Sequence, residues 1–293
     1  MSTYLWPTIL DDAHEISSDA EILESFFNQI FSPYKTIYLS QARHFIPLVL
    51  RYYHLGRSDI IFTPPYSSHC LLSNIAVQAT PSVQNELNNK INASIIYHQY
   101  GKTEKVNSKI YPNIIIEDSV DSFIIDCSEE NIFPNNASFA IVSLSKILPL
   151  PFGGIIICKD QKHYNGIKNN ISNNDLDIAT CELYQKNKYL RPTILQNFQK
   201  MTPVIKNIEY LYKSTRKKIE ANCKFVEKTF NISIDKKNIL PSNILSKDFD
   251  ILNTKEYKNM NIQEPIRHIF NYDQKISEKK VLIPVHAQAN WQK

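Results

Sequence analysis

The chain has 293 residues, enough for one large domain and a smaller one. Its 43% hydrophobic and 21% charged residues are typical of a soluble globular protein, and no apolar run approaches the ~18 residues that a membrane span needs. A net charge of +4 is too small to indicate a nucleic-acid partner.

Cysteine and glycine usage excludes further classes of protein. The five cysteines form no CxxC pair and no zinc spacing, which favours reduced thiols and a cytoplasmic location. Only five glycines occur, and neither a Walker loop nor a dinucleotide-binding loop is present. The segment Met1–Pro7 has no basic region followed by a long apolar run, so we expect no signal peptide.

Short apolar runs alternate with helical segments through the first half of the chain. Ser18-Asp19-Ala20-Glu21 has the form of a capping box and predicts a helix that ends near Phe31. Ser40 is a natural N-cap for a helix over 41–55, with Gly56 as its C-cap. A further helix is predicted over 70–78, and strands over 35–39, 59–63, 93–98, 113–116, 123–127, 139–143 and 154–158.

This alternation predicts an α/β fold with a mostly parallel sheet sandwiched by helices. The runs 141–143 and 155–158 are too close for a helical crossover, so we expect them to be antiparallel neighbours. Helical spacing over 205–230 predicts one long amphipathic helix or two, and short β-like pieces follow at 232–234, 266–270 and 281–285. We therefore expect a large domain over 1–204, and the long helix with a small C-terminal α+β domain over 205–293.

Lys146 is the first candidate for chemistry. It follows Ser143 and Ser145 at the end of an apolar strand and precedes an apolar segment that leads to Gly153-Gly154. Such a lysine is expected to be partly desolvated, which lowers its pKa and favours a reactive amine, while nearby hydroxyls can bind a phosphate. The alternative is an ordinary surface lysine.

Asp118 is the natural partner of Lys146. It ends an apolar strand, and the carboxyl ends of parallel strands are where α/β sheets bind ligands. Pyridoxal phosphate (PLP) needs both a lysine for its aldehyde and a carboxylate that keeps its ring nitrogen protonated. A helix cap or a turn is the alternative for Asp118 taken alone.

Other polar groups have the placement that a bound cofactor requires. Ser40-Gln41-Ala42 lies at a strand-to-helix junction, where backbone N–H groups favour an anion. Tyr66 and His69 follow Pro64-Pro65 and offer rings that can stack on a flat cofactor, although an ordinary turn is as good an interpretation. His98 closes a strand and can line a site, but a lone histidine is more often structural.

The order of these segments resembles the DegT/StrS family of PLP-dependent sugar aminotransferases, within the aspartate aminotransferase fold type I. The resemblance runs from about Ser40 to His286, and the ordered set of motifs is more specific than any one of them. The matching segments are Ser40–Ala42, Ser58–Ser67, His98–Gly101, Glu117–Asp121, Ser143–Lys146 with Gly153-Gly154, Tyr189–Arg191, the region of Arg216, and Ile283–His286.

The resemblance implies a function and a role for each site residue. Lys146 would form the internal aldimine and shuttle a proton, and Asp118 would protonate the ring nitrogen. Ser40, Gln41, Ala42 and Ser143 would hold the phosphate. The reaction would move an amino group from an amino acid, glutamate being the expected donor, to a keto group of a nucleotide-linked sugar. The family works as a homodimer with shared active sites.

The sequence departs from the family pattern at three positions. Asp121 stands where the family usually has glutamine or histidine near the ring hydroxyl. Ser68 stands where a stacking aromatic is common, so that Tyr66 or His69 would substitute for it, and Tyr189 replaces an asparagine. These departures leave open a degenerate homologue with a binding or regulatory role. A sugar dehydratase is disfavoured, because that variant replaces the lysine with histidine.

Overall fold

A seven-stranded sheet forms the centre of the computed structural model, which describes residues 16–17, 21–83, 90–107, 111–112, 114–150, 153–171, 202–203 and 207–291. Five neighbouring strands run parallel, whereas β9 is antiparallel to both its neighbours. In spatial order the strands are β2 (Lys35–Leu39), β9 (Gly154–Cys158), β8 (Phe139–Ser143), β6 (Ile115–Asp118), β5 (Ile91–Tyr97), β3 (Ile60–Phe62) and β4 (Thr80–Ser82). The predicted mostly parallel sheet is confirmed.

The predicted antiparallel pair is also confirmed. β8 and β9 pair with Phe139 opposite Cys158 and Ser143 opposite Gly154. All five residues of β9 are buried, because helices cover both faces of the sheet. Side chains alternate between these faces: Ile156 packs in one core and Ile155 in the other.

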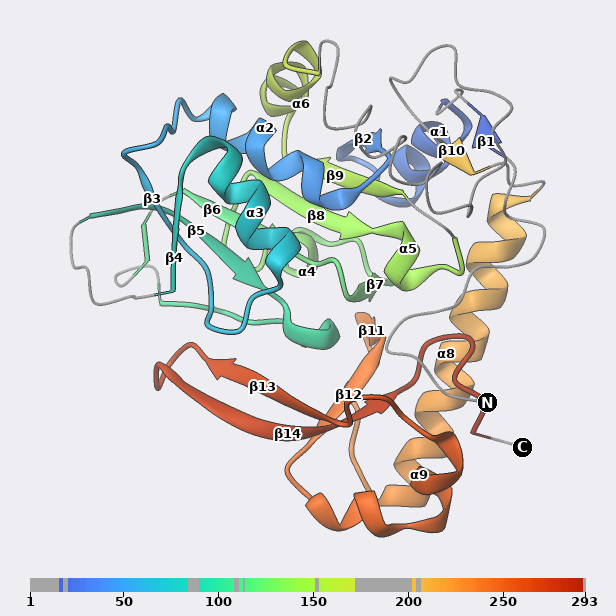
Figure 1. Ribbon diagram of the computed structural model, residues 1–293. Coiled ribbons are helices and arrows are strands. Elements are labelled where there is room, and N and C mark those ends of the chain that lie inside the picture. Colours follow the sequence, from blue (N-terminus) through green and yellow to red (C-terminus); the bar gives the residue numbers. More distant parts are fainter. Residues whose placement is uncertain are drawn as a thin grey trace.

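Different helices cover the two faces of the sheet (Figure 1). One face packs against α2 (Phe45–Tyr52), α3 (His69–Gln78) and α6 (Gln161–Asn169). The other packs against α1 (Glu21–Ile30) and α8 (Ile208–Phe230). Shorter helical segments are η1 (Ala42–His44), η2 (Gln99–Gly101), α4 (Glu129–Ile132), α5 (Leu144–Ile147), η3 (Phe249–Asn253) and α9 (Lys255–Met260).

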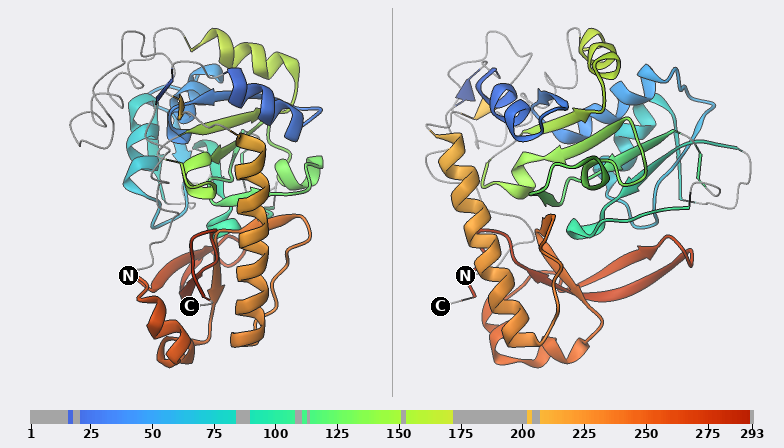
Figure 2. Two further views of the ribbon diagram at one scale, coloured as in Figure 1. Left: turned by 90° about the vertical axis from the view of Figure 1, so that its right-hand side faces the viewer. Right: turned by 180° about the vertical axis from the view of Figure 1, so that it is seen from behind.

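The C-terminal segment is built on α8, which runs from the main sheet to a second, smaller sheet (Figure 2). Asn207 caps its first turn by accepting a hydrogen bond from the Tyr210 N–H at 2.8 Å, and Asn231 ends it in the left-handed conformation. The small antiparallel sheet has the order β12 (Asn243–Ser246), β14 (Ile276–Pro284), β13 (Ile266–Asn271). The long helix is confirmed, whereas the predicted domain boundary at 204/205 stays a prediction.

Two small strand pairs complete the fold. β11 (Ile239–Pro241) pairs with β7 (Ser122–Ile124), which joins the C-terminal segment to the main sheet region. β1 (Ile16–Ser17) pairs with β10 (Thr202–Pro203). No helix among the described residues is long and apolar enough to cross a membrane.

Several predicted boundaries were wrong. The helix expected over 41–55 starts as η1 and ends as α2 at Tyr52, and the left-handed residue that follows it is His54, not Gly56. Gly56 instead donates its N–H to Asp59 Oδ2 at 2.7 Å. No strand forms at 232–234, and the strand of this region is β11. Residues 18–20 of the predicted capping box lie outside the described residues.

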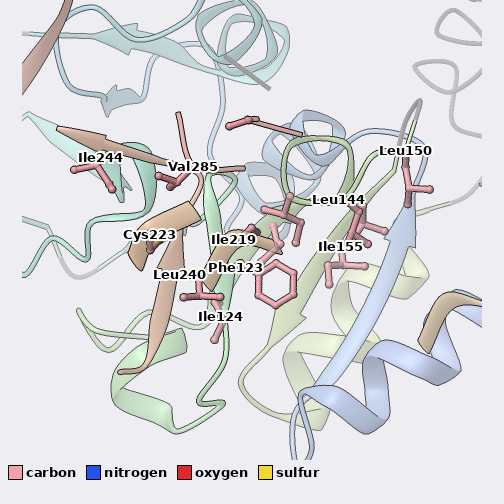
Figure 3. Close-up of a cluster of buried hydrophobic side chains, with 14 of the residues drawn as sticks. Phe123, Ile124, Leu144, Leu150, Ile155, Ile219, Cys223, Leu240, Ile244 and Val285 are labelled. Carbon is pink, nitrogen blue, oxygen red and sulfur yellow. The ribbon is translucent and has the colours of Figure 1, made fainter. Parts of the chain in front are cut away.

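One hydrophobic core, here called the shared core, links the main sheet to the C-terminal segment. It unites Phe123 of β7, Ile155 of β9, Ile219 of α8 and Leu240 of β11, and Val285 follows β14 into it. Figure 3 shows these side chains clustered between strands and helices that are far apart in the sequence. The small sheet is therefore packed against the region that bears the candidate site.

Candidate active site

Lys146 lies on α5, the short helix that begins directly after β8 (Figure 1). Its Nζ lies 3.0 Å from Asp121 Oδ1, and its side chain is partly buried. Because α5 starts where β8 ends, the lysine is placed at the carboxyl edge of the parallel strands, where α/β folds bind ligands. Lys146 therefore follows a strand end, as predicted, and lies on a short helix.

Asp118 is the last residue of β6, the strand beside β8. It is buried, and its Oδ1 accepts a hydrogen bond from the Val120 N–H at 3.2 Å. Burial raises the pKa of Asp118 above its usual value, and Lys146 offsets part of that rise. The strand pairing thus brings the carboxyl group and the lysine to neighbouring positions on one edge of the sheet.

Asp118 and Lys146 face one cavity of about 240 Å³. Its walls come from the segment after β2, the start of α3, and the ends of β5, β6 and β8. The lining residues are Gln41, Ala42, Arg43, Ile46, Ser68, Cys70, Leu71, Ile95, Asp118, Val120, Ile141, Ser143, Ser145 and Lys146. Of the predicted site residues, five line this cavity: Gln41, Ala42, Asp118, Ser143 and Lys146.

The turn at 40–43 is held in place by the Gly153-Gly154 pair. A Cβ on Gly154 would lie 2.3 Å from both the Cα and the N of Ala42, so only glycine allows β9 to approach the turn this closely. Gly153, with a φ of 120°, donates its N–H to the Ser40 carbonyl at 2.7 Å and accepts from the Leu144 N–H at 2.9 Å. These bonds join the turn to the helix that bears Lys146.

Ser40 itself is fully buried behind this turn and does not line the cavity. Gln41 is extended, and the chain enters η1 and then α2 after it. The first N–H groups of a helix lack partners within the helix, which makes the turn suited to an anion.

Tyr66 and His69, whose rings were candidates for stacking on a cofactor, do not line the cavity. The ring of Tyr66 stacks on His268 of β13 instead, with 4.2 Å between ring centroids, and His69 is exposed. Ser68, the N-cap of α3, and Cys70 line the wall in their place. Neither Cys70 nor Arg43 was predicted as a site residue, yet both line the cavity. The predicted helix start near residue 70 was the signal available for Cys70.

Asp121 is fully buried and turned away from the cavity. Its carboxylate accepts hydrogen bonds from Lys146, from the Tyr97 hydroxyl and from the Tyr100 backbone N–H. Burial acts to lower the pKa of Lys146, but Asp121 and Asp118 outweigh it, so that the net shift is upward. The prediction of a lowered lysine pKa is therefore wrong, because it took no account of Asp121.

His98 supports the site from behind. Its Nδ1 accepts from the Glu104 N–H at 3.1 Å, so its Nε2 carries the proton and faces Glu117 Oε2 at 3.2 Å. Asn135 donates to both carboxylate oxygens of Glu117, from its backbone N–H and from Nδ2. This buried network fixes the end of β6 and therefore the direction of Asp118, which is the structural role expected of a lone histidine.

The residues of the cavity fit PLP. An amine, a carboxylate at a strand end and a helix-starting turn with the Ser143 hydroxyl nearby are the groups that PLP requires. The close approach that Gly154 permits shows that the turn is packed against the strand beside the lysine.

Comparison with known proteins agrees with this chemistry. A family model described as "Putative PLP-dependent aminotransferase" matches residues 23–292. The chain belongs to this family. It is a PLP-dependent aminotransferase. No curated protein sequence matches it.

Solved structures of aminotransferases share the fold of this aminotransferase. DesV of S. venezuelae, in complex with a ketimine intermediate, is 10% identical with a TM-score of 0.56, over 95% of this chain and 87% of that chain. A DegT DnrJ EryC1 StrS aminotransferase from Brucella abortus is 11% identical with a TM-score of 0.58, over 92% and 85%. Spr1654 of Streptococcus pneumoniae, a "putative sugar aminotransferase" in its PMP form, is 13% identical with a TM-score of 0.53, over 97% and 87%. The predicted fold type I is confirmed.

Of the three remaining motifs, two lie away from the cavity and one lies outside the described residues. Tyr189–Arg191 lies outside the described residues. Arg216 of α8 pairs with Glu220 at 2.9 Å, one helical turn further on. His286 is buried, and its carbonyl accepts from Asn222 Nδ2 of α8 at 2.9 Å, which ties the end of the chain to the long helix.

Proposed function

We propose that this aminotransferase moves an amino group from an amino acid, with glutamate as donor, to a keto group of a nucleotide-linked sugar. The observation that carries the proposal is the shared cavity of Lys146 and Asp118 at the carboxyl ends of β6 and β8. The sugar is supported by the fold shared with Spr1654, which is described as a sugar aminotransferase, and by the ordered motifs of the sequence.

We assign a role to each predicted site residue that lines the cavity. The N–H groups of the turn at Gln41 and Ala42, with the Ser143 hydroxyl, hold the cofactor phosphate. Ser40 contributes through its carbonyl, which anchors Gly153 and so fixes the turn. Asp118 holds a proton on the ring nitrogen as its counter-ion. Tyr66 and His69 are assigned no cofactor contact, since neither lines the cavity.

Lys146 is the proton carrier of the proposed reaction. PLP supplies an aldehyde that links to amines and a ring that withdraws electrons from the carbon next to the nitrogen. Lys146 Nζ, held at the cavity edge by α5, moves the proton between that carbon and the cofactor. The burial of Asp118 strengthens its electrostatic interaction with Lys146.

The proposal also includes the assembly and the compartment. We place the enzyme in the cytoplasm, supported by four free cysteines among the described residues. We expect a homodimer with active sites shared between the subunits, as the resemblance to the DegT/StrS family implies. Sedimentation of the purified protein tests this expectation, and a monomer at micromolar concentration would contradict it.

The direct test follows the visible absorption of the PLP-loaded protein. Glutamate should abolish the visible band, and a nucleotide-linked keto sugar should restore it. Lys146→Ala should slow both changes by at least about 100-fold, because the proton carrier is lost. A loaded protein that accepts an amino group from no amino acid would overturn the proposal and favour the binding or regulatory role.

A further inference from the structure

Three elements converge on Asp121 behind the reactive lysine. Asp121 follows β6, Tyr97 ends β5, and Tyr100 lies in η2. The Oδ1 atom of Asp121 lies 3.0 Å from Lys146 Nζ, while Oδ2 accepts from the Tyr97 hydroxyl. The Tyr100 N–H is a further donor to the same carboxylate. The position where the resemblance led us to expect a contact with the cofactor ring thus contacts the lysine instead.

The backbone holds Asp121 in this orientation. Tyr100 has a φ of 56° and Gly101 a φ of 85°, an arrangement that directs the Tyr100 N–H toward Asp121. A Cβ on Gly101 would lie 2.6 Å from the Pro241 Cα, so β11 closes the turn from the other side. The carboxylate is fully buried and is held in this orientation by three donors.

The groups around Lys146 carry more negative than positive charge. Two buried carboxylates, Asp118 and Asp121, act on one ammonium group. Other titratable groups among the described residues that are electrostatically coupled to one of these three are the Cys70 thiol, His98 and the hydroxyls of Tyr97, Tyr100 and Tyr272. When the amine adds to an aldehyde and one water leaves, the linked nitrogen is neutral unless it keeps a proton. Losing that proton to water would leave Asp121 as an uncompensated buried charge, and burial, which raises the pKa of Asp121, makes such a charge strongly unfavourable.

We propose that Asp121 is the counter-ion that keeps a proton on the Lys146 nitrogen after it has linked to the cofactor aldehyde, and that Tyr97 and Tyr100 are positioning residues that aim Asp121 at that nitrogen. The inference rests on the proposed function, since it needs Lys146 to bear the cofactor. In this arrangement Asp118 is the counter-ion of the ring nitrogen, and Asp121 is the counter-ion of the lysine nitrogen.

The first test is a pH titration of the visible absorption of the PLP-loaded protein, which reports protonation of the linked nitrogen. Asp121→Asn should lower the pKa of this transition by about 1 to 3 units, the usual effect of removing a neighbouring opposite charge. Asp160→Asn is the matched control, because Asp160 caps α6 away from the cavity. If the visible absorption of the Asp121→Asn protein changes at the same pH as that of the wild type, the inference is overturned.

The second test separates the charge from a merely structural role. In the cofactor-free protein, Asp121 raises the pKa of Lys146 and so reduces the amount of free amine at neutral pH. Asp121→Asn should therefore increase the initial rate at which added PLP is captured on Lys146 and fixed by hydride reduction. A distorted site would capture PLP more slowly, and that result would contradict the inference.

Failure of the two proposals is distinguishable. If the wild-type protein acquires no hydride-reducible link at Lys146, the proposed function fails. If the wild type forms the link and Asp121→Asn changes neither the titration nor the capture rate, only the assignment of Asp121 fails.

Discussion

Cys70 is the residue best placed to report on the cavity. It lines the wall beside Lys146, and its Sγ lies 2.9 Å from Ser68 Oγ. Its half-buried thiol differs from those of Cys158 and Cys223, which are buried. The thiol of Cys127 is also half-buried, but burial raises its pKa to about 11, so little of it is thiolate at neutral pH.

The position of Cys70 in the cavity wall predicts site-specific protection. Among the four described cysteines, Cys70 should be alkylated first at neutral pH, and saturating PLP should slow its modification at least several-fold because the cofactor covers it. Peptide mass spectrometry after timed exposure to iodoacetamide measures each site. Cys127 is the internal control, since it lies outside the cavity and its rate should not respond to PLP. Equal protection of Cys127 would show a general effect, and an unprotected Cys70 would place the cofactor elsewhere.

At the scale of elements, the contact between β9 and the turn at 40–43 determines the phosphate side of the cavity. Gly154→Ala places a methyl group 2.3 Å from the backbone of Ala42, which cannot move without displacing the turn. We expect a loss of about 1–3 kcal/mol in stability, as for other overpacked sites, and weaker PLP binding. Thermal unfolding and cofactor titration measure the two effects.

Gly166→Ala is the matched control for this substitution. A Cβ on Gly166 would lie 2.2 Å from the ring edge of Tyr52. The side chain of Tyr52 is half-buried and can shift to relieve the contact. Alanine also favours a helix more than glycine does, by roughly 0.5–1 kcal/mol. Gly166→Ala should leave PLP affinity unchanged. If it weakened binding as much as Gly154→Ala, the effect would not come from the turn.

Elements with a strong local signal were predictable from the sequence. The strand over Lys35–Leu39 has the predicted bounds, and the paired runs of β8 and β9 were recognisable from their short spacing. β4 was missed because Thr80–Ser82 contains no apolar run, and its strand conformation comes from pairing with β3. α2 ends before Gly56 because His54 takes the left-handed conformation instead.

The site was predictable in its principal residues and not in their orientation. Asp118 is the last residue of β6 and Lys146 follows β8, and the sequence pattern marks both strand ends. The orientation of Asp121 depends on Tyr97 and Tyr100, and the displacement of Tyr66 depends on His268 of the small sheet. Such contacts between distant segments leave no periodic signal in the sequence, so only the folded chain reveals them.

At the scale of the whole molecule, the shared core makes the C-terminal segment and the main sheet interdependent. Phe123 is 1% exposed and its ring lies 4.6 Å from that of Tyr212 on α8. Phe123→Ala should cost about 3–5 kcal/mol in stability, because it removes a large side chain from a packed centre. Calorimetry should show one unfolding transition at a lower temperature, since both parts lose the same contacts.

Phe249→Ala is the control for the shared core. Phe249 is 41% exposed in η3, and its loss should change stability by no more than about 0.5 kcal/mol. Two separate transitions in the wild type would contradict the interdependence, and so would equal effects of the two substitutions.

The most direct test of the account is covalent trapping of the cofactor. The purified protein is incubated with PLP, reduced with hydride and digested, and the modified lysine is located by mass spectrometry. We expect a single major adduct on Lys146, which disappears in Lys146→Ala. A protein that binds PLP with the adduct on another lysine, or with none, would contradict it.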